Sequence, residues 1–155
     1  MCTGIALPLS ELPASLLGTP TVTARVYLRE GREEVQFHWW QTPTVLPVRW
    51  EGQLQFLPWG SKQRRGSTLP LGGWVSEEGI LAGMFAGASP EPVVIPAVLG
   101  QHAGTWFLIS EGVRGFVVFD RTGPVVYMLT RPATNYYRNM TEQQPMMPVF
   151  VNQVI

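Results

Sequence analysis

Short runs of β-branched and aromatic residues, separated by Gly-containing turns, recur along the chain. In the first half, two pairs of such runs flank Gly31 and the dipeptide Glu51-Gly52. Two strand-like runs joined by a tight turn are typical of a β-hairpin. The pattern therefore predicts two hairpins, one pairing 21–28 with 35–39 and the other pairing 46–50 with 53–57.

The second strand of the first hairpin alternates between apolar and polar side chains. Val35, Phe37 and Trp39 alternate with Gln36 and His38. Because successive side chains of a strand point to opposite faces, this alternation predicts one buried and one solvated face. We therefore expect His38 to be exposed to solvent.

The second half of the chain holds longer apolar runs with little alternation. Continuous hydrophobicity indicates strands buried on both faces, covered by helices or by a second sheet. We predict central strands over these runs, and one last strand at the end of the chain: 93–99, 105–110, 115–119, 125–130 and 149–154.

Two segments carry helix signals. Residues 10–17 begin with Ser10, a residue type that caps helices, and are followed by Gly18, a typical stop. Residues 132–141 have Pro near the first turn. In this second helix we expect one side to carry Tyr136, Tyr137 and Met140.

The segment 61–73 is basic and Gly-rich and shows no strand pattern. It contains Lys62, Arg64 and Arg65, the one dense basic cluster of the sequence. Segments of this composition are typical of surface loops. We expect a mobile loop whose basic side chains are either solvated or placed against phosphates.

Together these patterns predict an α+β, mainly β fold, in which antiparallel or mixed sheets form a barrel-like or two-layer core with a few short helices. The 155 residues fit a single domain over 1–155, because single cores usually stop growing only beyond about 250 residues. Pro and Gly are spread along the chain and do not gather into a linker.

Composition narrows the classes of function. Hydrophobic residues make up 45% of the chain and charged residues 14%, which excludes a disordered protein. Eleven basic residues balance eleven acidic ones, so no net charge steers the molecule onto nucleic acid or an acidic membrane. No apolar stretch approaches the ~18 residues of a membrane span, and a signal-peptide pattern is missing. We expect a cytoplasmic protein without a membrane partner.

A single cysteine, Cys2, excludes an internal disulfide and fits a reducing compartment. The sequence contains no Cys pair, no His-Glu-x-x-His, no Walker-type Gly-Lys-Ser/Thr and no Gly-x-Gly-x-x-Gly. Since such patterns mark metal and nucleotide sites, we predict no metal and no cofactor. The sequence carries no signal for an oligomeric state.

Short motifs, in order along nearly the whole chain, resemble those of the SRAP (SOS-response-associated peptidase) family. The family begins Met-Cys-Gly-Arg, and this chain begins Met1-Cys2-Thr3-Gly4. The family's Trp-Gly-Leu-x-Pro-x-Trp segment is resembled by Leu57-Pro58-Trp59-Gly60, and its Asn-Ala-Arg-x-Glu-Thr motif by Gly73-Trp74-Val75-Ser76-Glu77-Glu78. Val94-Ile95-Pro96-Ala97 resembles its Val-Pro-Ala, and Gly104-Thr105-Trp106-Phe107-Leu108 resembles its Gly-Phe-Tyr-Glu-Trp. Tyr127-Met128-Leu129-Thr130 with Ala133 resembles its strand and Thr-x-x-Ala, and Gln144-Pro145-Met146-Met147-Pro148-Val149 resembles its His-x-Arg-Met-Pro-Val.

The resemblance implies recognition of abasic sites in single-stranded DNA, a covalent bond from Cys2 to the ring-opened sugar aldehyde, and self-cleavage that removes Met1. An N-terminal cysteine suits this chemistry, because its α-amine has a pKa near 7.7–8.0 and its thiol a pKa near 8.5. Together the two groups can close a five-membered thiazolidine on an aldehyde.

The chain departs from the family at the residues that move protons. The glutamate of the family's Gly-Phe-Tyr-Glu-Trp is replaced by Phe107, and the histidine of its last motif by Gln144. Ring closure on an aldehyde needs a proton donor and acceptor. The remaining candidates are Glu77 or Glu78 as the carboxylate and His102 as the imidazole. The simpler interpretation is that the two glutamates are solvated at the start of a helix and that His102 is an ordinary loop histidine.

Trp59 and Trp74 are candidates for stacking on unpaired bases, as aromatic residues do in single-strand binders. Lys62, Arg64 and Arg65 are candidates for phosphate contacts. The simpler interpretation places the tryptophans in the core and the basic residues in solvent.

Two other functions remain open. The first is a binding or scaffold protein that keeps the SRAP fold but has lost its catalysis, which the replacements at Phe107 and Gln144 favour. The second is an unrelated cysteine hydrolase that uses Cys2 with His102.

Overall fold

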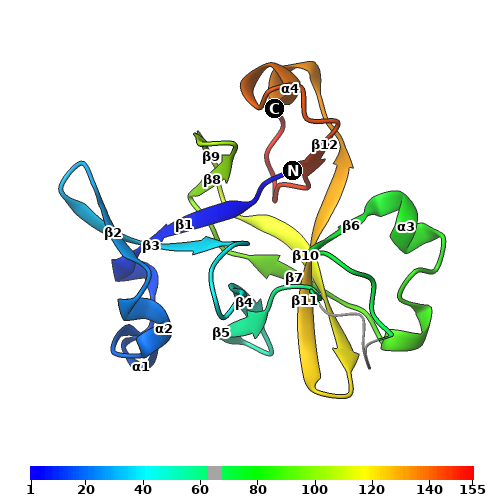
Figure 1. Ribbon diagram of the computed structural model, residues 1–155, viewed down its shortest axis with the longest axis horizontal. Helices are drawn as coiled ribbons and strands as arrows, with labels where there is room; N and C mark the ends of the chain where they lie inside the picture. The colour runs from blue at the N-terminus through cyan, green and yellow to red at the C-terminus, as the bar shows by residue number, and fades with distance from the viewer. Residues whose placement is uncertain (63–67) are drawn as a thin grey trace.

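The protein is described by a computed structural model over residues 1–62 and 68–155, and it is built from two β-sheets with a few short helices (Figure 1). One sheet has five strands in the order β2-β3-β1-β8-β9: β1 (Gly4–Pro8), β2 (Val26–Arg29), β3 (Arg32–His38), β8 (Leu99–His102) and β9 (Thr105–Leu108). The other follows the order β12-β11-β10-β7-β4-β5, with β6 beside β11: β4 (Val45–Trp50), β5 (Gln53–Pro58), β6 (Trp74–Ser76), β7 (Glu91–Ile95), β10 (Val113–Asp120), β11 (Gly123–Pro132) and β12 (Met146–Pro148).

The helical segments are all short. They are η1 (Leu9–Glu11), α1 (Ala14–Leu17), α2 (Pro20–Thr23), α3 (Glu77–Leu81), η2 (Ala86–Ala88) and α4 (Asn135–Met140). Among the described residues, none of these helices has the length and hydropathy needed to cross a membrane.

The main hydrophobic core lies between the two sheets and takes side chains from both, among them Phe37 of β3 and Val117 of β10. A second cluster covers the other face of β10 and β11, where Val118 and Tyr127 pack against the segment 69–88. The central strands of the larger sheet are therefore buried on both faces. This confirms the prediction of a mainly β, two-layer core, and the sheets do not close into a barrel.

Both predicted hairpins are confirmed. β4 and β5 pair with Trp50 opposite Gln53, and the two linking residues, Glu51 and Gly52, have φ angles of 53° and 74°. Positive φ at both central residues defines a type I′ turn, whose twist matches that of the flanking strands. β2 and β3 pair in the same way around Gly31.

The prediction of a helix over 10–17 is wrong in detail. Leu12 is extended, because a residue before proline avoids the helical region. The chain therefore forms η1, breaks, and starts α1 after Pro13, with Gly18 at its end. The strand predicted from residue 21 starts at Val26, because Pro20 begins helix α2.

The apolar run 93–99 is not one strand. β7 ends at Ile95 in the larger sheet, and β8 begins at Leu99 in the smaller one. Pro96 lies at the break, and a proline has no N–H for the ladder of a central strand. The chain passes from one sheet to the other at this point.

The last helix and the last strand are shifted from their predicted positions. Pro132 ends β11, and α4 starts after Thr134, whose Oγ1 accepts a hydrogen bond from the Tyr137 amide. Tyr137 is buried and Tyr136 is 64% exposed, because neighbouring residues of a helix point about 100° apart. The final strand is Met146–Pro148 instead of 149–154.

The prediction of a solvated His38 is wrong, since His38 is 4% exposed. Gln36 is also buried. In the predicted loop 61–73, Ser61 pairs with Gly72 in an isolated bridge, and the residues 63–67, including Arg64 and Arg65, lie outside the described part of the chain.

Candidate functional site

The first three residues are held in place by other segments. The Thr3 amide donates to the Gln101 carbonyl at 2.8 Å, and the Trp39 amide donates to the Thr3 carbonyl at 2.9 Å. The indole Nε1 of Trp74 donates to the Cys2 carbonyl at 3.0 Å. Chain ends are usually loose unless other segments hold them, and these bonds continue the pairing of β1 into the first residues.

The Cys2 side chain belongs to the main core and is completely buried. Its Sγ donates to the Gly4 carbonyl at 2.9 Å. Burial raises the pKa of this thiol to about 11, against smaller lowering effects from backbone hydrogen bonds and the charged N-terminus. With Met1 in place, the Cys2 sulfur is therefore protonated at neutral pH.

The Met1 amine donates to Oε1 of Gln144 at 2.9 Å. Figure 1 shows the N-terminus beside β12, which begins two residues after Gln144. Burial lowers the pKa of this amine, because a charged group loses its hydration there. We call Met1, Cys2, His102, Tyr137 and Gln144 the N-terminal site.

His102 lies at the end of β8, two positions along the strand from the partner of Ile5. Burial lowers the pKa of its imidazole, and the positive charge of the N-terminus lowers it further, while the Met1 backbone and Glu142 act in the opposite direction. The imidazole beside Met1 is therefore neutral at pH 7 and can accept a proton. Its Nδ1 is buried without a hydrogen-bond partner.

Tyr137 of α4 is completely buried, and its hydroxyl also has no hydrogen-bond partner. Burial, and then the charge of Cys2, raise the pKa of this phenol, so the group stays neutral. In the described part of the chain, three buried side-chain polar atoms lack a partner, and two of them belong to the N-terminal site. Such atoms are rare in folded proteins and call for a specific explanation.

Phe107 of β9, which the sequence resemblance aligns with a glutamate of the SRAP family, lies next to Tyr137. Its ring packs edge-on against Tyr137, with centroids 5.6 Å apart, and against Phe150 at 6.1 Å. The side chain is buried in the main core. This position therefore borders Tyr137 but supplies no acid.

The two candidate carboxylates are placed elsewhere. Glu77 and Glu78 begin α3, which Figure 1 shows apart from the N-terminus. The Glu77 carboxylate pairs with Nε of Arg131 at 2.9 Å, and Glu78 is exposed. The structure thus brings His102 and Gln144 to Met1, the residue before Cys2, and it gives Glu77 a different partner.

The candidate DNA-binding residues lie in different environments. Trp59 is 1% exposed and donates from Nε1 to the Gly73 carbonyl, so its ring has no free face for a base. Trp74 is half-buried, and its role at the site is to hold the Cys2 backbone. Lys62 is exposed, with Nζ 4.5 Å above the ring of Trp39.

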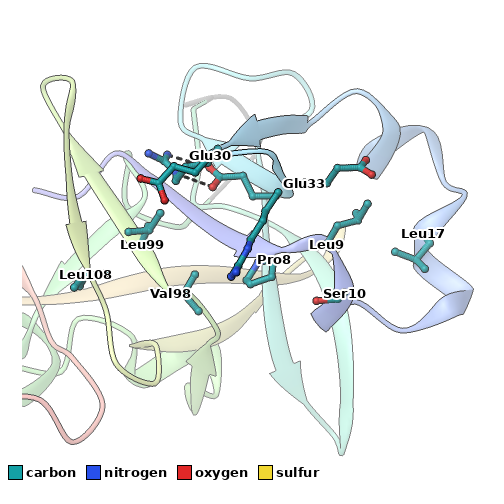
Figure 2. A pocket seen from close by; sticks show the side chains of 12 residues that line it. Pro8, Leu9, Ser10, Leu17, Glu30, Glu33, Val98, Leu99 and Leu108 are labelled. Carbon is teal, nitrogen blue, oxygen red and sulfur yellow. Dashed lines mark hydrogen bonds and ion pairs between the residues drawn. The ribbon is translucent and has the colours of Figure 1, made fainter.

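A groove of about 1020 Å³ lies where the β2–β3 hairpin, the end of β1 and the β8–β9 hairpin meet (Figure 2). Leu99 and Leu108 give it apolar walls, and Arg32 and Glu33 line it with charge. The groove contains no residue of the N-terminal site. Within 1–62 and 68–155, no group of three His, Cys, Asp or Glu side chains is arranged to hold a metal ion.

Comparisons with protein-family models, with curated proteins and with solved structures each return no match for this chain. The chemistry of the N-terminal site must therefore be argued from its own geometry. Sequence reasoning marked Cys2, His102 and Gln144 but missed Tyr137, whose burial beside Cys2 depends on contacts between distant segments.

Proposed function

We propose that this protein, after removal of Met1, is SRAP-like and captures abasic sites of single-stranded DNA as a thiazolidine on Cys2. The observation that carries the proposal is the N-terminus itself. It is anchored by backbone hydrogen bonds and surrounded by a neutral imidazole, an unpartnered phenol and the Gln144 amide.

Removal of Met1 changes the site in two ways. It places a new α-amine on Cys2, next to the Cys2 thiol. It also removes the residue whose amine now binds Gln144. The Gln144 amide oxygen and the His102 imidazole would then face the reacting atoms.

The reaction needs no oxidant and no metal. The Cys2 amine attacks the sugar aldehyde, and loss of one water gives an imine. Sγ then adds to the imine carbon, and the thiol proton ends on the nitrogen. A neutral His102 suits this proton transfer, because it can take the proton from sulfur and return it to nitrogen.

The test uses protein that begins at Cys2, as checked by its intact mass. This protein is incubated with an abasic single-stranded oligonucleotide, and the products are analysed under denaturing conditions. We expect a stable adduct with the wild type and none with Cys2→Ala. His102→Gln should slow the adduct about 10²- to 10⁴-fold, whereas Leu81→Ala, an exposed residue of α3, should not change it. Absence of an adduct with the processed wild type contradicts the proposal.

The second candidate is a binding protein of the same fold without catalysis. The raised pKa of the Cys2 thiol, and the Phe107 and Gln144 replacements, favour it. It predicts that Cys2→Ala binds single-stranded DNA as the wild type does and that neither forms an adduct. A cysteine hydrolase is disfavoured, because its nucleophile needs a lowered thiol pKa.

A further inference from the structure

Trp40 is 68% exposed and lies two residues after the end of β3. Its ring stacks on the imidazole of His38, with centroids 5.1 Å apart and planes inclined by 18°. The opposite face of the indole is left to solvent. A large aromatic ring held flat on a support, with its other face free, is the arrangement that binds a second flat ring.

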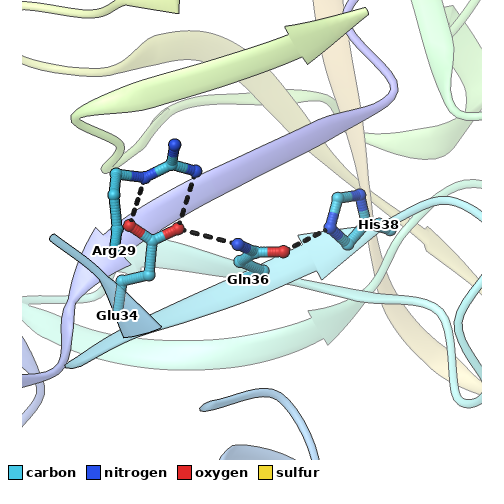
Figure 3. A network of polar contacts seen from close by, with 4 residues as sticks. All are labelled: Arg29, Glu34, Gln36 and His38. Carbon is cyan, nitrogen blue, oxygen red and sulfur yellow. Dashed lines mark hydrogen bonds and ion pairs between the residues drawn. The ribbon is translucent and has the colours of Figure 1, made fainter. Parts of the chain in front are cut away.

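The support under Trp40 is rigid because a chain of hydrogen bonds fixes His38 (Figure 3). Arg29 donates two hydrogen bonds to Glu34, at 2.7 and 3.0 Å. Gln36 then donates its amide N–H to Glu34 at 2.8 Å. The Gln36 oxygen is therefore left as the acceptor for Nε2 of His38, at 2.9 Å. This sets the proton of His38 on Nε2.

His38 is also confined on its other sides. Trp106 of β9 meets it edge-on, with centroids 5.8 Å apart, and Arg29 covers the Trp106 ring at 4.5 Å. On β1, a Cβ at Gly4 would lie 2.4 Å from Nδ1 of His38, so only glycine leaves room for the imidazole. We call His38, Trp40 and Trp106 the aromatic platform.

The aromatic platform adjoins the N-terminal site. The amide of Trp39, the neighbour of Trp40, donates to the carbonyl of Thr3, the neighbour of Cys2. Lys62 lies over Trp39 and donates from Nζ to the Trp39 carbonyl and to Oγ1 of Thr44. Lys62 is exposed, so its ammonium is within reach of a ligand in solvent.

We propose that the aromatic platform stacks the nucleobase next to the abasic position, and that Lys62 binds the phosphate beside it. The inference rests on the proposed function, because it takes the abasic nucleotide to be at Cys2. Stacking on a flat aromatic face holds single strands without reading their sequence, because every base presents a flat ring. Any of the four bases should therefore serve.

The test separates stacking from adduct formation. Wild-type protein is titrated with two labelled oligonucleotides that carry a tetrahydrofuran spacer, which has no aldehyde, at the abasic position. In one, normal nucleotides flank the spacer, and in the other the flanking nucleotides also lack their bases. We expect the wild type to bind the first about 5- to 100-fold more tightly, by fluorescence anisotropy.

Trp40→Ala should bind both oligonucleotides equally weakly, and Trp40→Phe should keep part of the difference. Phe119→Ala, a partly exposed aromatic residue on the β10–β11 hairpin, is the control and should behave as the wild type. Since Trp40 is exposed, its replacement should leave the unfolding midpoint unchanged.

If Trp40→Ala and the wild type prefer the first oligonucleotide over the second to the same extent, the inference is wrong, even if the protein forms the adduct. Discrimination that depends on Trp40, in a protein that forms no adduct with a true abasic site, supports the aromatic platform and contradicts the proposed function. If the protein binds no DNA but binds a peptide saturably at Trp40, both the inference about the aromatic platform and the proposed function are wrong.

Discussion

At Cys2, burial works against reactivity for as long as Met1 is present. The same desolvation that makes the sulfur a core atom keeps it protonated. Loss of Met1 would place an amine beside this buried atom. The processed and unprocessed chains should therefore differ in chemistry much more than in fold.

The raised thiol pKa makes stability depend on pH. The unfolded chain loses its Cys2 proton near pH 9, and the folded chain keeps it to about pH 11, so stability contributed by the buried thiol is lost as pH rises between these values. The loss approaches about 3 kcal/mol at pH 11. In urea unfolding of the unprocessed protein, the wild type should lose stability from pH 8.5 to 10.5 faster than Cys2→Ala. Parallel pH profiles would contradict a buried thiol.

Tyr137 carries a buried hydroxyl without a partner, which is unfavourable for stability. Tyr137→Phe keeps the ring and its contact with Phe107. We expect it to raise the free energy of unfolding by about 1 kcal/mol, measured by chemical denaturation. A loss of stability of that size would mean that the hydroxyl has a partner in solution.

At the scale of elements, local signals were predicted well and distant contacts were not. The β4–β5 hairpin follows from Glu51-Gly52 alone, because the turn fixes the register. The burial of His38 does not follow from its strand, since it depends on Trp106, which arrives from β9. The segment around Pro96 shows the same limit of sequence-based prediction. Its hydrophobicity predicts strands on both sides of Pro96, but it does not predict that the chain changes sheet there.

The candidate site shows the same contrast between what residue types predict and what distant contacts decide. Cys2, His102 and Gln144 were identified by residue type and by resemblance, and the pairing of β1 with β8 brings the first two near each other. Glu77 was a candidate by residue type, but its charge is satisfied by Arg131 of β11. Its partner comes from a parallel pairing of β6 with β11, which no pattern in the sequence indicates.

The type I′ turn of the β4–β5 hairpin contains a strained residue. Glu51 has a φ of 53°, a conformation that asparagine adopts more easily. Glu51→Asn creates the Asn-Gly pair preferred in such turns and should add about 0.5–1 kcal/mol of stability, seen as a higher Tm. Glu111→Asn, at an exposed residue outside both hairpins, is the comparison. An unchanged Tm would mean that the turn is not under strain.

At the scale of the whole molecule, the N-terminus connects the two sheets. Gln101 of the smaller sheet binds Thr3, Trp74 of the larger sheet binds Cys2, and Gln144 binds the Met1 amine. The first residues of the chain thus help to hold together segments that are far apart in the sequence.

A short Gly-Ser extension ahead of Met1 should therefore destabilise the protein. It replaces the charged amine by an amide and forces added chain past Gln144. A hydrogen bond from a charged group contributes about 1.5–3 kcal/mol, and we expect a loss of this order in thermal or urea unfolding. The same extension after Ile155, beside the fully exposed Val154, is the control and should have little effect. Equal effects at both ends would contradict a structural role for the amine.

The hydrogen bond between Met1 and Gln144 joins two residues that are 143 positions apart along the chain. At about 5–20 residues per second, translation takes on the order of 10 s to reach Gln144. Until then the Met1 amine has no Gln144 amide to bind. The N-terminus can therefore reach its folded position only after nearly all of the two sheets has been synthesised.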